Sequence, residues 1–136
     1  HYGKKEYRLE QLRLGYVQTD YRYVSKFKDG AWDAGELTTD PNVTLNECAG
    51  VFQYAQTVFE GMKAYTTEDG HIVTFRPDLN AERMAASAAR LEMPVFPKED
   101  LSTLLSRLLR QMLHGFRHMV PAQHFIFART CLVPTP

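Results

Sequence analysis

The sequence predicts a small α+β domain with a mainly antiparallel sheet and two packed helices. A pattern of period two runs through residues 61–76 around a Glu-Asp-Gly turn and indicates a β-hairpin. Two helical patterns follow it, over residues 79–93 and 97–116. With 136 residues, 44% of them hydrophobic, the chain suffices for one hydrophobic core. We expect residues 1–136 to form one domain, and an incomplete one, because a buried strand comes directly before the last residues.

The part of the chain before the hairpin is predicted to hold little regular structure. Residues 4–14 favour a short helix. Side chains from Val17 to Phe27 alternate between two faces, which predicts a half-buried strand. Lys28-Asp29-Gly30 predicts a turn, because glycine tolerates the positive φ that a hairpin bend needs. Residues 31–47 are interpreted mainly as a connection, with a short strand at Val43–Leu45.

The stretch from Tyr54 to Arg83 combines several features that suit a ligand. Val58–Gly61 predicts a turn with apolar surface beside a glycine, where a ligand can approach the backbone closely. The helix after the hairpin is expected to begin at an Asn80 N-cap and to end soon after Met93, before a proline. Arg83 would then lie in about the first turn, beside free backbone N–H groups that suit a phosphate. An exposed helix arginine is the alternative interpretation.

The last third of the chain predicts a second helix and a strand. The helix starts near Pro97 or Lys98 and reaches Phe116, with an amphipathic spacing that is unbroken. Residues His124–Val133 predict a largely buried strand. These two elements would complete a layer of helices on a sheet.

Composition excludes several classes of function. The chain has 16 basic and 16 acidic residues and a pI near 7.1, so no long-range electrostatic field favours the binding of nucleic acid or of an anionic membrane. No apolar run approaches the roughly 20 residues of a membrane helix. Cys48 and Cys131 are not in a CxxC pair, which excludes a zinc knuckle. They could form one disulfide, but a reduced, cytosolic protein is the preferred interpretation.

The sequence contains few candidates for catalytic residues. The sequence has no Walker loop, GxSxG or GxGxxG motif. His114 and His118 are four positions apart, but a histidine pair without carboxylates is usually a surface feature, so we predict no metal site. Lys63 has the strand parity opposite to Met62, which favours a solvated lysine over a buried nucleophile. Glu60, between an aromatic residue and a glycine, stays open as an acid/base group.

The segment Val58–Tyr65, with the sequence VFEGMKAY, resembles the N-terminal small domain of the branched-chain amino-acid aminotransferases. These are class IV, fold-type IV enzymes that use pyridoxal 5'-phosphate. The resemblance continues through the EDG turn, residues 75–84 (FRPDLNAERM) and residues 91–101 (LEMPVFPKEDL), and upstream through residues 15–24. It covers about residues 12–126. It implies the fold of that small domain.

The resemblance also implies roles for individual residues. Arg83 matches the arginine that contacts the phosphate of the cofactor. Tyr54 and Phe59 match residues of the apolar pocket for the branched side chain of the substrate, with the tyrosine reaching toward the partner subunit's site. Lys63 matches a position that is not catalytic.

The chain departs from the family pattern at two places. Gln53-Tyr54-Ala55 stands where the family has His-Tyr-Gly, and residues 125–128 read Phe-Ile-Phe-Ala where it has Tyr-Ile-Arg-Pro. The arginine two places later, Arg129, is a candidate substitute for carboxylate recognition. We expect substrate binding at Tyr54, Phe59 and Arg129.

The resemblance implies a transaminase that moves the amino group of leucine, isoleucine or valine to 2-oxoglutarate. The lysine that binds the cofactor covalently lies in the family's large domain, which is absent here, so we expect no catalytic residue and no activity from residues 1–136 alone. The family implies a homodimer. The alternatives are a D-amino-acid aminotransferase or an aminodeoxychorismate lyase of the same fold, and a non-enzymatic binding or dimerisation module.

Overall fold

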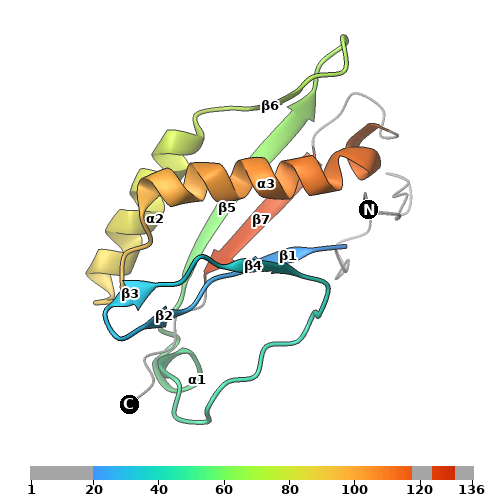
Figure 1. Cartoon of the computed structure of the whole chain (residues 1–136). Helices are drawn as coiled ribbons and strands as arrows, with labels where there is room; N and C mark the ends of the chain where they lie inside the picture. The colour runs from blue at the N-terminus through green and yellow to red at the C-terminus, as the bar shows by residue number, and fades with distance from the viewer. Residues whose placement is uncertain (1–19, 118–123, 131–136) are drawn as a thin grey trace.

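The computed structural model describes residues 20–117 and 124–130. Its strands are β1 (Arg22–Val24), β2 (Phe27–Lys28), β3 (Ala31–Trp32), β4 (Glu36–Thr38), β5 (Val58–Thr66), β6 (Ile72–Thr74) and β7 (His124–Thr130). Its helices are α1 (Gly50–Tyr54), α2 (Pro77–Arg90) and α3 (Lys98–Arg117). Helices on small antiparallel sheets confirm the predicted α+β class (Figure 1).

A three-stranded antiparallel sheet in the order β6-β5-β7 forms the centre of the fold. Tyr65 on β5 is opposite Val73 on β6, which confirms the predicted hairpin. The predicted turn at Val58–Gly61 is wrong, because these residues form the first half of β5. Their side chains alternate between buried and exposed, as on a strand. Pairing with β7 keeps this segment extended, and pairing partners 66 to 72 positions away are difficult to foresee from local sequence.

Two short ribbons precede this sheet, β1 with β4 and β2 with β3. The strand predicted at 17–27 is therefore interrupted within its described part. The turn is confirmed: Asp29 and Gly30 both have positive φ, of 52° and 83°. Residues 31–47 hold two strands that the sequence did not predict, whereas Val43–Leu45 has no strand pairing.

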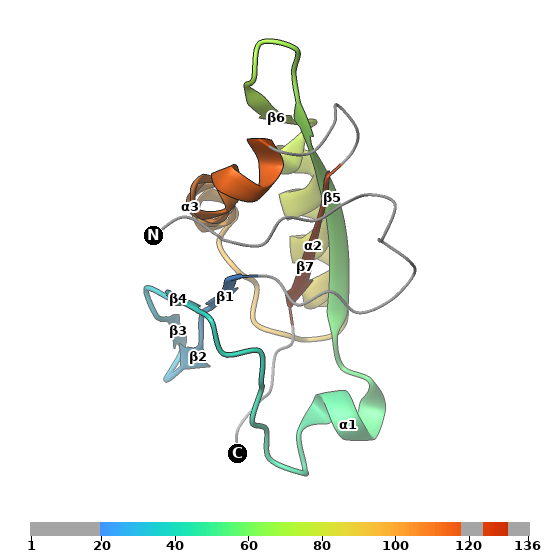
Figure 2. The ribbon, with the colours of Figure 1, turned by 90° about the vertical axis from the view of Figure 1, so that its right-hand side faces the viewer.

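Helices α2 and α3 lie on one side of β5, as the turned view shows (Figure 2). Their buried side chains meet those of β5 in one core, made of Val58, Met62, Ala81, Met84, Ala88, Met93, Leu101 and Leu105. The prediction for α3 is confirmed at its start, because the helix begins at Lys98. Leu79, in the first turn of α2, and Leu91, its C-cap residue, are 45% and 41% exposed. Alanines 81 and 88 let α2 pack closely instead.

Trp32 attaches the β2–β3 ribbon to this core by packing against it. Its ring contacts Phe27 and Phe96 edge-on, with centroids 5.3 and 5.0 Å apart. Its indole N–H donates to the carbonyl oxygen of Val95 at 3.0 Å. The residue thus joins a ribbon from the start of the chain to the connection between α2 and α3.

Some predictions fall outside the described residues. These are the helix at 4–14, the first part of the strand at 17–27, the strand residues after Thr130, and any pairing that involves Cys131. Among the described residues, no helix is long and apolar enough to cross a membrane.

Candidate functional site

Strand β5 has one buried and one open face, and the candidate site spans both. Val58, Glu60, Met62 and Ala64 are buried beneath the helices. Phe59, Gly61 and Lys63 alternate with them on the exposed side. One strand therefore links the hydrophobic core to a surface that a ligand can reach.

A charged cluster lies where β5 meets α2. The Glu60 carboxylate accepts hydrogen bonds from Arg83 Nε and Nη2, each at 2.8 Å. Asn80 Nδ2 donates to Glu60 Oε2 at 2.8 Å and to the carbonyl oxygen of Gly61 at 2.9 Å. The side chain of Glu60 is 7% exposed and that of Arg83 is 65% exposed. The cluster holds a buried acid on the strand against an arginine that remains open to solvent.

The start of α2 differs from the prediction. The helix begins at Pro77 with Arg76 as N-cap residue, and Asn80 is inside it. Proline suits the first helical position, because its fixed φ is helical and its missing N–H would be unpaired there. Asn80 instead uses its amide to bind Glu60 and Gly61.

Arg83 consequently lies nearly two turns into the helix, six residues after its first residue. The free N–H groups of a helix belong to its first turn. The predicted combination of Arg83 with free N–H groups at the helix start is therefore wrong. A ligand at Arg83 would therefore be bound by the guanidinium, which Glu60 holds in place, and not by free N–H groups of the helix.

Phe59 lies on the open face of β5, with 64% of its surface exposed. A Cβ built on Gly61 would lie 3.7 Å from two ring atoms of Phe59, so the ring lies alongside the glycine. In the β5–β7 register, Phe59 is directly opposite Arg129. Two of the predicted substrate-binding positions are thus neighbours on adjacent strands, although 70 positions separate them in the sequence.

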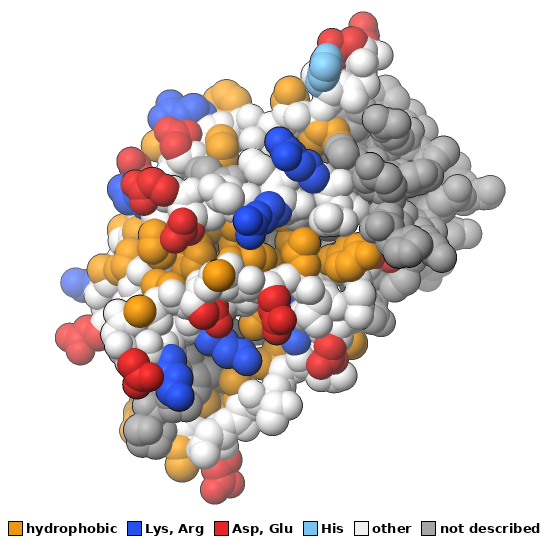
Figure 3. All heavy atoms as spheres, viewed as in Figure 1, with side chains coloured by type: hydrophobic (Ala, Val, Ile, Leu, Met, Phe, Trp, Pro, Cys, Tyr) orange, Lys and Arg blue, Asp and Glu red, His pale blue; other side chains and the backbone are white. Residues whose placement is uncertain are grey.

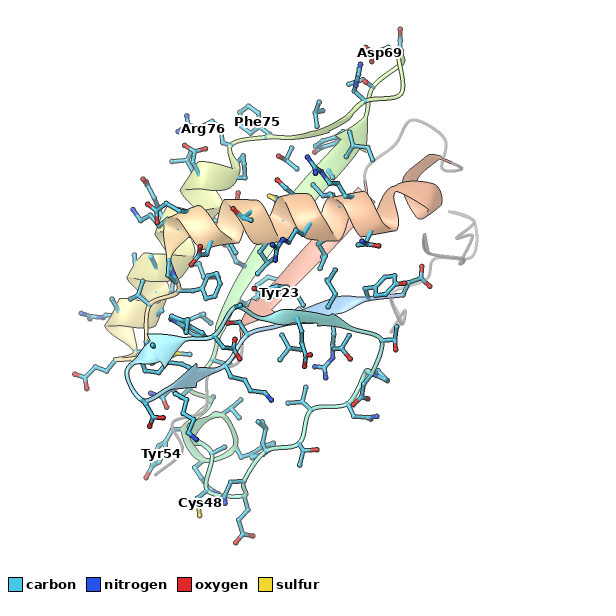
Figure 4. All side chains as sticks on the ribbon, in the orientation of Figure 1. Tyr23, Cys48, Tyr54, Asp69, Phe75 and Arg76 are labelled. Carbon is cyan, nitrogen blue, oxygen red and sulfur yellow. The ribbon has the colours of Figure 1, made fainter. Side chains whose placement is uncertain are left out.

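Tyr54 is placed by a separate element. It is the last residue of α1, and Ala55 caps this helix in the left-handed conformation with φ of 51°. Tyr54 is 87% exposed and lies beside α1, at the end of the molecule away from the β5–β6 hairpin (Figure 4). The sequence did not predict α1, because five residues are too few for a helical period.

The remaining candidates are exposed or lie outside the described residues. Lys63 is exposed, as its strand parity predicted. Cys48 is exposed and forms no disulfide within the described part of the chain. The described residues contain no group of three metal-binding side chains. His118 lies outside the described residues, so the histidine pair is not defined.

A groove of about 330 Å³ lies away from this cluster, between α3 and the β1–β4 ribbon. Hydrophobic side chains form a band across this face of the molecule, with acidic and basic groups on both sides of it (Figure 3). The residues that line the groove are Tyr23, Gly35, Glu36, Leu37, Arg107, Arg110 and Gln111. It shares no residue with the candidate site.

Sequence reasoning left Glu60 undefined and gave Asn80 the wrong role. A signal for Glu60 was present, because it is the acidic member of an otherwise apolar row with Val58, Met62 and Ala64. Buried acids need partners, so this row implies a donor nearby. The identity of that donor depends on how α2 crosses β5.

Known proteins resemble this chain over most of its length. The branched-chain-amino-acid aminotransferase of Haemophilus influenzae is 46% identical over 95 residues, which are 70% of this chain and 28% of that protein. The methionine aminotransferase of Arabidopsis thaliana is 47% identical over 92 residues, 67% of this chain and 26% of that protein. The cytosolic branched-chain-amino-acid aminotransferase of Saccharomyces cerevisiae is 40% identical over 102 residues, 74% of this chain and 27% of that protein. The chain thus spans about a quarter of the length of these relatives. No family model matches it.

Proposed function

Because this chain carries a segment of the branched-chain-amino-acid aminotransferase family, we propose that it contributes one wall of the active site of such an enzyme. The reaction would transfer the amino group of leucine, isoleucine or valine to 2-oxoglutarate. The observation that carries the proposal is the 46% identity to the Haemophilus influenzae aminotransferase over 70% of this chain.

The proposed cofactor is pyridoxal 5'-phosphate, and Arg83 is the residue that would hold its phosphate. The fit is supported by the exposure of Arg83 and by the geometry of the cluster, in which Nη1 makes no hydrogen bond or ion pair with the described residues. A guanidinium with an open edge suits a phosphate, because it can donate two parallel hydrogen bonds. The cofactor, when bound, supplies an electron sink for the reacting carbon. The protein residues then contribute binding and orientation.

The open face of β5 is proposed to receive the side chain of the donor. Phe59 offers exposed aromatic surface beside Gly61, and Arg129 stands opposite it on β7 as the candidate partner of a substrate carboxylate. Tyr54 would contribute from α1 toward the site of a partner subunit in a homodimer. An apolar pocket distinguishes poorly between side chains that differ by a methylene, which is worth about 1–3 kcal/mol. We therefore expect leucine, isoleucine and valine all to serve as donors.

The name of the Arabidopsis thaliana relative favours methionine as a further donor. Methionine has an unbranched apolar side chain of similar volume to that of leucine, so the same surface would suit it. We also propose that the reactive lysine is supplied by a second, larger domain, and that the enzyme works in the cytoplasm, as the yeast relative is described as cytosolic.

The test uses the complete gene product that contains these residues. It is purified with pyridoxal 5'-phosphate and assayed for glutamate formation from 2-oxoglutarate with L-leucine, L-methionine or D-alanine. We expect turnover with L-leucine and none with D-alanine. Residues 1–136 expressed alone, the matched control, should bind no cofactor covalently and should be inactive.

The competing functions give other results. A D-amino-acid aminotransferase would use D-alanine in preference to L-leucine, and a lyase would act on aminodeoxychorismate and give pyruvate. A non-enzymatic binding module would show no absorbance from a cofactor bound to lysine. Turnover by residues 1–136 alone would contradict the assignment of the reactive lysine to another domain.

A further inference from the structure

The Glu60–Arg83 contact uses only one edge of the guanidinium. Nε and Nη2 face Glu60, and Nη1 makes no hydrogen bond or ion pair with the described residues. A guanidinium has five N–H donors in a rigid plane, so a carboxylate on the Nε edge leaves the Nη1–Nη2 edge for a second anion. The large exposed fraction of Arg83 places that second edge within reach of solvent.

The core gains little from an acid at position 60. The other side chains of its row on β5 are apolar, and an apolar residue of similar size would spare the cost of burying a charge. Arg83, in contrast, gains a fixed position. Asn80 strengthens the arrangement, since one amide joins Glu60 to the backbone of Gly61. A carboxylate held on both sides is a rigid support for the arginine.

The Arg76–Asp78 pair is an arginine–carboxylate contact in which neither side chain is buried, in contrast to the Glu60–Arg83 pair. These residues are two positions apart at the start of α2, and their side chains are 54% and 57% exposed. Exposed pairs of this kind are weakly held. The pair therefore serves as a matched control for removing a carboxylate from an arginine.

We propose that Glu60 is a positioning residue, which fixes Arg83 so that its outer edge is ready to bind the phosphate of the cofactor. The inference rests on the proposed function. A long, flexible side chain loses rotamer freedom when it binds an anion, and this loss weakens the affinity. If the side chain is already immobilised, the loss is avoided and the affinity is about two- to tenfold higher. The charge of Glu60 acts in the opposite direction, because it reduces the attraction of Arg83 for an anion. The two effects predict opposite results when Glu60 is changed.

The experiment measures binding of two ligands to the apo form of the complete gene product. Pyridoxal 5'-phosphate and pyridoxal differ only in the phosphate, so the ratio of their dissociation constants reports the phosphate contacts. Binding is followed by absorbance in wild type, Glu60→Gln, Glu60→Asp, Arg83→Ala and the control Asp78→Asn. Circular dichroism checks the fold of each variant.

Glu60→Gln should weaken the binding of pyridoxal 5'-phosphate by about two- to tenfold and leave pyridoxal unchanged. Glu60→Asp keeps the charge but withdraws the carboxylate by one methylene, so it should weaken the phosphate ligand as well. It also provides the test if the glutamine variant does not fold. Asp78→Asn should bind both ligands like wild type.

Equal or tighter binding of pyridoxal 5'-phosphate to Glu60→Gln would overturn the inference, as would wild-type binding by Glu60→Asp. The proposed function fails separately. If Arg83→Ala retains the full preference for the phosphorylated ligand, Arg83 does not bind the phosphate at all. If Arg83→Ala loses that preference while both Glu60 variants keep it, only the positioning role is wrong.

Discussion

Glu60 and Arg83 form an ion pair across the boundary between core and solvent, with the acid inside and the base outside. Two hydrogen bonds of 2.8 Å join them across 23 positions of sequence. The members are not equivalent, because the buried carboxylate cannot turn to water when its partner is removed, whereas the exposed guanidinium can. Removal of Arg83 should therefore affect stability differently from removal of the Glu60 carboxylate.

Arg83→Ala should destabilise the protein by about 1–3 kcal/mol, the usual cost of a buried polar group that loses a partner. Unfolding in urea measures this difference. Adding Glu60→Gln to Arg83→Ala should recover part of the loss, since the buried charge is removed. Arg76→Ala, in which only an exposed pair is lost, should change stability much less than Arg83→Ala does. Equal effects of Arg83→Ala and Arg76→Ala would contradict the asymmetry.

Trp32→Phe should weaken the attachment of the β2–β3 ribbon. The substitution removes the hydrogen bond to the carbonyl oxygen of Val95 and part of the contact with Phe96. We expect a loss of about 1–3 kcal/mol in the free energy of unfolding, measured by circular dichroism in urea.

Trp32 is the single tryptophan of the chain, so its fluorescence reports this attachment directly. In wild type its emission should shift together with the circular dichroism signal as urea rises. A shift at clearly lower urea would indicate that the ribbon detaches before the core unfolds, and the ribbon would then contribute little to global stability.

The sequence predicted the parts of the fold that depend on local pattern. The β5–β6 hairpin and α3 follow from residues near one another in the chain, such as Glu68-Asp69-Gly70 and the leucines after Lys98. The extended form of Val58–Gly61 depends on β7, more than 60 positions away, and a local reading mistook it for a turn.

The sequence named residues of the candidate site, but it did not predict how these residues lie relative to one another. Phe59 and Arg83 were both named from the sequence, but the sequence did not show that Phe59 lies on the open face of β5 while Arg83, on α2, binds Glu60 of its buried face. Asn80 has a strong preference for helix N-caps, and this local preference was overridden by its tertiary contacts with Glu60 and Gly61. No local pattern predicts such contacts, because they depend on where α2 crosses the sheet.

Asp33 should make the stability of the β1–β4 region depend on pH. Its carboxylate accepts hydrogen bonds from the Lys26 N–H, the Ser25 hydroxyl and the Gly35 N–H, at 2.9, 2.9 and 3.0 Å. These bonds, the Lys26 N–H first, hold the pKa of Asp33 below its ordinary value of 3.8. A lowered pKa in the folded state stabilises the fold at pH values above the unfolded pKa. That contribution disappears as the pH falls through the folded pKa.

Asp33→Asn tests this, because asparagine keeps an acceptor oxygen and removes the charge. Wild type should exceed the variant in stability by a constant amount above about pH 5, and the difference should shrink as the pH falls below 3.8. Urea midpoints between pH 2.5 and pH 6 measure it. Glu68→Gln, at the hairpin turn, is the control for removal of a negative charge. A difference that grows toward low pH would contradict the assignment.

Gly61→Ala should separate the folding role of this glycine from a ligand-binding role. The new Cβ would lie at an ordinary contact distance of 3.7 Å from the Phe59 ring, so the strand can accept it. Alanine also lowers the entropy of the unfolded chain, and we expect stability within about 1 kcal/mol of wild type. If the open face of β5 receives the donor substrate, the added methyl should raise KM for L-leucine by about tenfold.

Steady-state kinetics of the complete gene product test this effect with L-leucine and with the smaller donor L-alanine, for which the increase should be less. Val73→Ala is the matched control. It lies opposite Tyr65, four residues further along β5 than Gly61, and should leave KM unchanged. An unaltered KM for L-leucine in a stably folded Gly61→Ala would place the donor pocket elsewhere, and Phe59 would then be exposed for another reason.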